Sequence, residues 1–301
     1  ESGIDWNDLD ASDISIRGRH LRMVGKVMSG ELDRLSFKEK SGYVCHSISG
    51  RTKTGAGQSI IEDLRLSDPW SNIYIREFDM LYESEEDFSE YVDKVTMAGE
   101  IDSARVSFKT LSYFVPSLSG NSLTLDIKGS VRGTVNDFDV RHIHFSTPNG
   151  NLSGNIKGHI SDMIEPERMD MDLDMTGFRF TTREMEKLIE SFAPGTDTGL
   201  GKYASGKMFN MDATMKGQLN SLNVKADIGS RIGAVNTDIN LYNLIASGKP
   251  VGIRGVLQTD DLVLHGFLPG IPVRECSLVT GVNAELGTDI NVSIDSLKIS
   301  R

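Results

Sequence analysis

Three aspartates alternate with apolar residues in the segment 169–176, which reads MDMDLDMT. Carboxylates that lie close together can bind Ca²⁺, but an EF-hand loop also needs a glycine at its sharp turn and a distal glutamate, and this segment has neither. A period of two instead places all the aspartates on one face of a β-strand and all the apolar side chains on the other. We therefore interpret Asp170, Asp172 and Asp174 as the solvated face of a strand.

Other residues that could bind a metal ion or catalyse a reaction are better explained by structural roles. His142 and His144 share a strand face and could bind a metal ion, but no cysteine or third histidine is near them in the sequence. Glu165 and Glu167 flank a proline, and although paired carboxylates can perform acid–base chemistry, a polar turn is the better interpretation. The chain contains no G-x-S-x-G, H-E-x-x-H, P-loop or EF-hand spacing. We expect a non-enzymatic protein without a cofactor or a metal ion.

Composition limits the classes of partner. The 43 acidic and 32 basic residues give a net charge of −11, which disfavours binding to nucleic acid, and no cluster of lysine and arginine predicts docking on an anionic membrane surface. The two cysteines, Cys45 and Cys276, lie far apart and belong to no C-x-x-C pair, which excludes a zinc or thioredoxin-type site. The sequence leaves open a long-range disulfide or two separate buried thiols, and the second is favoured.

Alternation of apolar and polar residues is the dominant pattern of the chain, and it predicts an antiparallel sheet with one dry face and one solvated face. The apolar residues expected on the dry face are Leu123, Leu125, Ile127, Leu152, Ile156, Ile160, Met169, Met171, Leu173, Met175, Phe209, Met211 and Met215. Glycines interrupt these strands, and within a strand they indicate a bulge, a bend or a close backbone approach. Curvature of a long sheet is the simplest interpretation of them here. The sequence leaves open whether the dry face is a closed core or an open groove.

A Phe-X-Pro motif recurs at 114–116, 192–194 and 267–269, at near-equal intervals of 78 and 75 residues. A fixed period of this kind predicts stacked copies of one supersecondary unit, and stacked units form elongated bodies. No strong linker is visible. We expect a single elongated repeat region over 1–301, with approximate units 1–82, 95–165, 166–245 and 250–301.

One helix is predicted clearly. A T-x-x-E capping box at 181–184 precedes apolar residues at helical spacing, and Pro194-Gly195 follows them. The segment 108–114 is a weaker counterpart in the preceding repeat. The predicted fold class is therefore mainly β: an elongated, curved antiparallel sheet with one or a few short helices.

Several stretches of the first quarter of the chain resemble one protein family. They are GIDWNDLDASDI at 3–14, LSFKEKSGYV at 35–44, IEDLRL at 61–66 and DPWSNI at 68–73. These stretches are similar to runs in TamB-like proteins of the AsmA-like superfamily, in particular its Bacteroidetes members. The later glycine-bounded strands, such as 122–133, are similar in style to strands of that superfamily.

The resemblance implies both a fold and a function. Members are large envelope proteins of diderm bacteria, anchored in the inner membrane and reaching across the periplasm. Their sheet, called a β-taco, has an apolar inner groove. They are implicated in outer membrane biogenesis through phospholipid transport and, with an outer-membrane partner, in assembly of surface proteins. The chain departs from the family in showing neither an anchor helix nor the C-terminal TamB module, so we expect an internal periplasmic segment of a longer protein.

The partners implied by this resemblance are phospholipid acyl chains, outer-membrane assembly proteins and the rest of the parent chain, including its inner-membrane anchor. Shielding of phospholipid is one functional hypothesis. A second is an assembly scaffold, whose exposed strand edges pair with client β-strands by augmentation. A third, a secreted β-solenoid that acts on carbohydrate, is poorly supported because aromatic residues make up only 7% of the chain.

Overall fold

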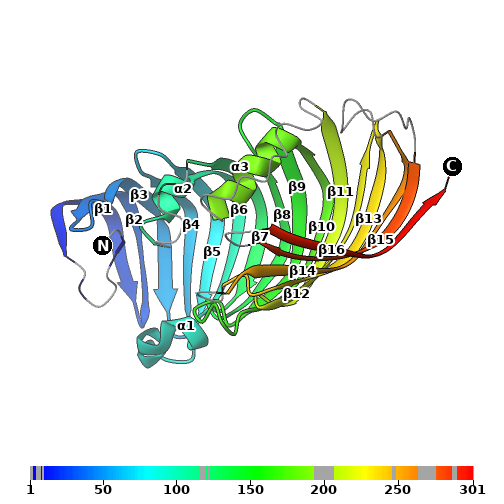
Figure 1. The fold of residues 1–301 in the computed structure, drawn as a ribbon. Helices are drawn as coiled ribbons and strands as arrows, with labels where there is room; N and C mark the ends of the chain where they lie inside the picture. Colours follow the sequence, from blue (N-terminus) through cyan, green and yellow to red (C-terminus); the bar gives the residue numbers. More distant parts are fainter. Residues whose placement is uncertain are drawn as a thin grey trace. The chain divides into compact units, whose positions relative to one another are not determined.

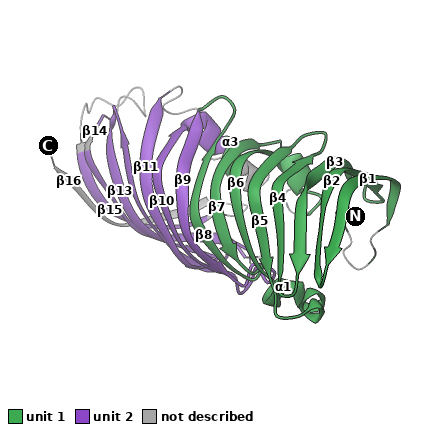
Figure 2. Cartoon of the chain, turned by 180° about the vertical axis from the view of Figure 1, so that it is seen from behind, with its two compact units in different colours: residues 1–150, 187–196 green, residues 151–186, 197–301 purple. Residues whose placement is uncertain are grey.

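A computed structural model describes residues 3–4, 8, 10–114, 120, 122–192, 207–245, 249–263, 276–286 and 290–300, without the side chains of 190–192, 261, 276, 286 and 290–300. The prolines of the first two Phe-X-Pro motifs, the whole third motif and the Gly-Leu-Gly stretch at 199–201 lie outside the described residues. The chain divides into two compact units, residues 1–150 with 187–196 and residues 151–186 with 197–301 (Figure 2).

The fold is mainly β, as predicted, with an open antiparallel sheet in which the strands follow one another in sequence order (Figure 1). The strands of unit 1 are β1 (Ala11–Val24), β2 (Val27–Glu39), β3 (Val44–Gly55), β4 (Gln58–Ser67), β5 (Asn72–Leu81), β6 (Thr96–Ser107), β7 (Thr124–Gly133) and β8 (Asp137–Ser146). Its short helices are η1 (Glu85–Glu90), α1 (Tyr91–Lys94) and α2 (Phe108–Leu111).

The strands of unit 2 are β9 (Leu152–Ser161), β10 (Asp170–Thr181), β11 (Met208–Gln218), β12 (Ser221–Ser230), β13 (Gly233–Tyr242), β14 (Val251–Leu262), β15 (Cys276–Leu286) and β16 (Ile290–Ser300). The helix α3 (Thr182–Phe192) follows β10, and its residues are divided between the two units. Within each unit every strand pairs antiparallel with the next one in the chain, so all the connections are local.

The sequence repeat corresponds to a period of four strands. The helix α2 follows β6, and α3 follows β10, four strands later. The first Phe-X-Pro motif begins just after α2, and the second begins at the last residue of α3. A further four strands lead to the end of β14, after which the third motif occurs in the sequence.

The predicted helix at 181–192 is confirmed as α3. The hydroxyl oxygen of Thr181 accepts a hydrogen bond from the backbone N–H of Glu184 at 3.3 Å, which satisfies one of the free donors of the first helical turn. The weaker counterpart is confirmed as α2, a single turn in which Ser107 accepts a hydrogen bond from the N–H of Lys109 at 3.3 Å.

Cross-strand partners on one face are apolar from strand to strand. One row of directly opposed residues in unit 1 is Ile16, Leu35, Ile48, Leu66, Ile73, Ala104, Ile127 and Phe145. A comparable row in unit 2 is Ile160, Met171, Gly217, Leu222, Leu241, Ile253 and Ala284. Because opposed residues on one face contact each other, each row is a continuous apolar strip.

The opposite face carries cross-strand ion pairs. Asp172 pairs with Lys216 at 2.9 Å and Asp174 with Lys157 at 3.4 Å, so the aspartates of β10 lie on the solvated face, as predicted. In unit 1, Arg105 donates two hydrogen bonds to the carboxylate of Asp126, at 2.7 and 2.9 Å. This contact lowers the pKa of Asp126 because it favours the charged form.

Glycines on the apolar face allow neighbouring strands to approach closely, which is one of the general explanations for a glycine within a strand. Gly158 in β9 has φ of 142°, and a Cβ there would lie 2.0 Å from the carbonyl oxygen of Asp172. Gly129 in β7 has φ of 141°, and its Cβ would lie 1.8 Å from the carbonyl oxygen of His142. Only glycine tolerates both the φ value and the contact.

A buried polar network in unit 1 joins the β4–β5 turn to α2. The carboxylate of Asp68 accepts hydrogen bonds from the backbone N–H of Trp70 and Ser71, at 2.7 and 2.8 Å, and from the hydroxyl of Thr110 at 2.9 Å. The hydroxyl of Ser71 donates to that of Thr110 at 2.7 Å and accepts from the N–H of Ser107 at 2.9 Å. Asp68 is only 4% exposed, so these bonds replace its hydration.

Replacing Gly158 by alanine is expected to lower the free energy of unfolding by about 2–4 kcal/mol, because the new Cβ overlaps the backbone of β10 at an unfavourable φ. Gly229→Ala in β12 is the matched control, since no atom lies within 4 Å of a Cβ built there, and its effect is expected to stay within about 0.5 kcal/mol. Chemical denaturation of both variants measures the difference, and equal effects would contradict the close approach at Gly158.

Thr110→Val is expected to destabilise the protein by about 1–3 kcal/mol, because the buried Asp68 carboxylate and the Ser71 hydroxyl each lose a partner. Thr52→Val is the control: Thr52 is half-buried between Gly30 and Ile61 on the apolar face of β3. Thermal unfolding of the two variants should show a clear loss for Thr110→Val alone.

Candidate functional site

The predicted apolar-face residues of unit 2 do lie together on one face of the sheet. The register pairs Ile160 with Met171, Ile156 with Met175, Leu173 with Met215, and the phenylalanines 180 and 209 with each other. Leu152 is opposite Phe180, and Met211 is opposite Phe178. Met169 lies immediately before β10. Because directly opposed residues share a face, these side chains form one apolar surface across β9–β11.

Three predicted residues belong to unit 1. Leu125 is opposite Val106, and Ile127 is opposite both Ala104 and Phe145, so both lie on the apolar face of β7. Leu123 precedes the strand and is half-buried. Its carbonyl oxygen accepts a hydrogen bond from the N–H of Phe108 at 2.8 Å, which ties the start of β7 to the start of α2.

Sequence reasoning missed Phe178 and Phe180, because the period of two ends in a bulge. Gly177, with φ of 57°, inserts one extra residue into β10, so the apolar face continues at Phe178 and not at residue 177. Phe178 is 2% exposed, and Phe180 stacks on Phe209 with ring centroids 5.5 Å apart. The glycine between Thr176 and Phe178 was the available signal for this change of phase.

Burial is uneven along the apolar face of unit 2. Met171 near the start of β10 is buried, as are Phe178 and Phe180 near its end, whereas Leu173 and Met175 between them are half-buried. Leu152 and Phe209 are also buried, and the residues Ile156, Ile160, Met169, Met211 and Met215 are half-buried. The larger side chains in the middle of the face are therefore partly accessible, although Ala213 and Ala226 there are buried, and the large fully buried side chains lie near the strand ends.

The same accessibility occurs in other strands. No side chain of β5, β7 or β13 is fully buried over the residues that the structure describes in them. A strand that lay beneath a second layer would bury every other side chain, as in β-sandwiches. Over these strands the apolar face is thus a surface that water can reach.

The other residues that could bind a metal ion or act in catalysis do not come together in one site. His142 and His144 are both exposed on β8, and the described part of the chain contains no group of three residues suited to hold a metal ion. Glu165 and Glu167 are exposed in the turn between β9 and β10, as predicted, and Glu165 forms an ion pair with Arg168 at 3.3 Å. No helix among the described residues has the length and apolarity needed to span a membrane.

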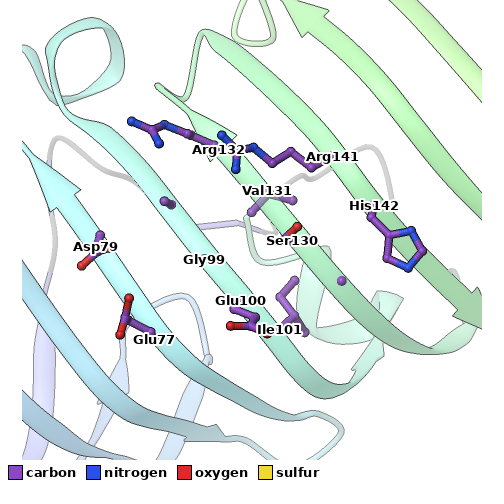
Figure 3. A pocket seen from close by; sticks show the side chains of 12 residues that line it. Glu77, Asp79, Gly99, Glu100, Ile101, Ser130, Val131, Arg132, Arg141 and His142 are labelled. Carbon is purple, nitrogen blue, oxygen red and sulfur yellow. The ribbon is translucent and has the colours of Figure 1, made fainter.

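A shallow depression of about 380 Å³ lies over β5–β8 in unit 1. Glu77, Asp79 and Glu100 line one side, and Arg132, Arg141 and His142 line the other. These side chains are spread along the sheet and do not point at a common centre (Figure 3). Small-molecule sites place their polar groups around one position, so this depression lacks the geometry of an active site.

Cys45 is a buried free thiol, 1% exposed, near the start of β3. Its pKa is raised by burial and, to a smaller extent, by the negative charge of Asp68. A thiol with a raised pKa stays protonated and inert, which indicates a packing role. The side chain of Cys276 lies outside the described residues.

Comparison of this chain with protein-family models, curated proteins and solved structures found no match. The functional argument therefore rests on the apolar face itself.

Phe178→Ala is expected to lower the free energy of unfolding by about 3–5 kcal/mol, because it opens a cavity in the core at the end of β10. Met215→Ala, in the half-buried middle of the face, is expected to cost about 1 kcal/mol. Guanidinium denaturation distinguishes the two. Comparable losses would mean that a second layer covers Met215, which would make the face a closed core.

Proposed function

We propose that this chain is a non-enzymatic, periplasmic segment of an AsmA/TamB-like envelope protein anchored in the inner membrane. In this proposal it shields the acyl chains of phospholipids that move between the inner and outer membranes during outer membrane biogenesis. The observation that carries the proposal is the apolar face of the sheet, whose cross-strand rows are continuous and whose larger side chains in the middle of the strands, such as Leu173 and Met215, are only half-buried.

The energetics favour an acyl chain as the ligand. Each buried CH₂ group contributes about 0.8 kcal/mol, so a 16-carbon chain could gain roughly 13 kcal/mol as an upper bound. One row runs from Leu173 through Met215 and Val224 to Ile239, four apolar residues on successive paired strands. A chain lying across such rows meets similar side chains at every strand, so it can slide without crossing a high barrier.

The methionines suit this ligand. Met171, Met175, Met211 and Met215 lie on the face of β10 and β11, and methionine is flexible and polarizable enough to pack against chains of different shape. The opposite face carries the Asp172–Lys216 and Asp174–Lys157 ion pairs and remains in water. The net charge of −11 also makes the polar surface a poor site for anionic headgroups.

Lipid binding can be tested by placing charge on the face. Leu173→Asp with Met215→Asp puts two carboxylates opposite each other in the middle of the apolar row. The chain is purified without detergent and its bound phospholipid is counted by native mass spectrometry and organic extraction. We expect near-stoichiometric phospholipid on the unmodified protein and a loss of about tenfold or more in the variant, because burying a carboxylate against an acyl chain is costly.

The matched control adds the same charge to the opposite face of the same two strands. Thr176 and Asn210 are exposed on the polar face of β10 and β11, so Thr176→Asp with Asn210→Asp should leave lipid binding unchanged. Circular dichroism verifies that both variants fold. A lipid-free, folded and monomeric wild-type protein would overturn the proposal, as would equal loss of lipid in both double variants.

A further inference from the structure

We propose that the depression over β5–β8 of unit 1 binds a short zwitterion with an amine at one end and a phosphate at the other, of the phosphoethanolamine class. This inference goes beyond the proposed lipid role and does not depend on it, because the charged walls of the depression lie on the polar face of the sheet and not on the apolar face. The charges around the depression determine the chemistry of the ligand.

Two small residues form the floor of the depression. Ala98 of β6 lies between Asp79 of β5 and Arg132 of β7 in the register. Ser130 of β7 is opposite Glu100 of β6 in the next row of the same face. Directly opposed residues share a face, so longer charged side chains surround a hollow of about 380 Å³ that Ala98 and Ser130 do not fill.

The acidic side of the depression holds carboxylates without partners. Glu77 is directly opposite Glu62 on one side and Glu100 on the other, so its nearest cross-strand neighbours carry the same charge. Those two neighbours each form an ion pair with an arginine, at 3.2 and 3.3 Å, whereas Glu77 forms none among the described residues. Asp79, two residues further along β5, has a buried oxygen, Oδ1, that lacks a hydrogen-bond partner in the described part of the chain. An ammonium group on this side would neutralise both carboxylates.

The basic side holds two arginines without carboxylate partners. Arg132 of β7 and Arg141 of β8 are exposed, and neither forms an ion pair with any described residue, although Asp139 is opposite Arg132 in the register. Figure 3 shows both arginine side chains extending in the direction of β6. His142 lies beside them on the wall of the depression. Guanidinium groups match the geometry of phosphate oxygens, so this side is suited to a phosphate.

The position of Arg141 makes its lack of a partner unusual in this sheet. Register shifts place Asp63, Arg76 and Asp102 in bulges of β4, β5 and β6. Asp63 forms an ion pair with Arg51 at 2.6 Å, and Arg76 pairs with Asp102. Arg141 also lies at a register shift, in β8, but forms no such pair over the described ranges. An anion bound in the depression would complete this series of paired charges.

The separation of the two charged sides determines the shape of the ligand. The strands β5 and β7 are two spacings apart, or about 10 Å, and the arginine side chains shorten this distance by extending toward β6. A ligand with charges at its two ends can contact both sides at once. A phosphate is favoured over a carboxylate because two guanidinium groups, His142 and the Ser130 hydroxyl offer many donors. The amine offsets the net charge of −11, which opposes a purely anionic ligand.

The probe is O-phosphoethanolamine, titrated into the full chain by isothermal titration calorimetry at low salt in a phosphate-free buffer. We expect saturable binding to a single site, weakened by salt. Inorganic phosphate and ethanolamine should each bind at least about tenfold more weakly, because each can occupy only one side of the depression.

Two pairs of substitutions test the two sides separately. Arg132→Gln with Arg141→Gln should weaken binding of O-phosphoethanolamine and of inorganic phosphate by about tenfold or more, because the anion loses its charged donors. Glu77→Gln with Asp79→Asn should weaken binding of O-phosphoethanolamine by about tenfold, while inorganic phosphate binds equally well or more tightly.

The matched control removes one charge of each sign from the polar surface of unit 2. Arg254 and Glu285 are exposed on the adjacent strands β14 and β15, so Arg254→Gln with Glu285→Gln should leave binding unchanged. Circular dichroism verifies that all three double variants fold.

Several outcomes would overturn the proposal. These are no saturable heat up to about 10 mM O-phosphoethanolamine, equally tight binding of inorganic phosphate, and an equal loss in the control variant. A second measurement identifies the source of the group. Sedimentation with vesicles containing phosphatidylethanolamine, lost in both site variants, would assign it to a lipid headgroup, whereas binding of the soluble compound alone would assign it to a free phosphorylated amine.

Discussion

The register between neighbouring strands is the constraint on which the rest of this structure depends. Side chains alternate with a period of two, so a slip of one residue would turn a whole strand's apolar residues to the polar face. The pairing keeps Leu173 opposite Met215 and Ile127 opposite Phe145. Where an extra residue enters a strand, as at Gly177, the bulge absorbs it and the apolar face resumes at Phe178.

Burial is distributed unevenly along these strands. Residues near the strand ends are buried, in the Asp68 network beside α2 in unit 1 and in the stacked cross-strand pair Phe180 and Phe209 in unit 2. The middle of the strands contributes backbone ladders and lateral contacts, while side chains such as Met215 stay half-buried. The proposed binding of sliding acyl chains needs this combination, since a closed core would leave no room for the ligand.

The same sheet presents two chemically different surfaces. Its apolar face suits the proposed acyl-chain ligand, because burial of apolar area is non-directional. Its opposite face carries cross-strand ion pairs such as Asp172–Lys216 and Arg105–Asp126 and stays solvated.

The sequence by itself determined the features that depend on residues close together in the chain. The alternation at 169–175 predicted β10 and its two faces, the capping box predicted α3, and the Phe-X-Pro spacing marked the four-strand period. Only the tertiary structure decided the change of phase at Gly177, the bonds between Asp68 and Thr110, and the half-buried state of Leu173 and Met215. These depend on which strands are neighbours and on what covers them, which are non-local interactions that a one-dimensional pattern cannot encode.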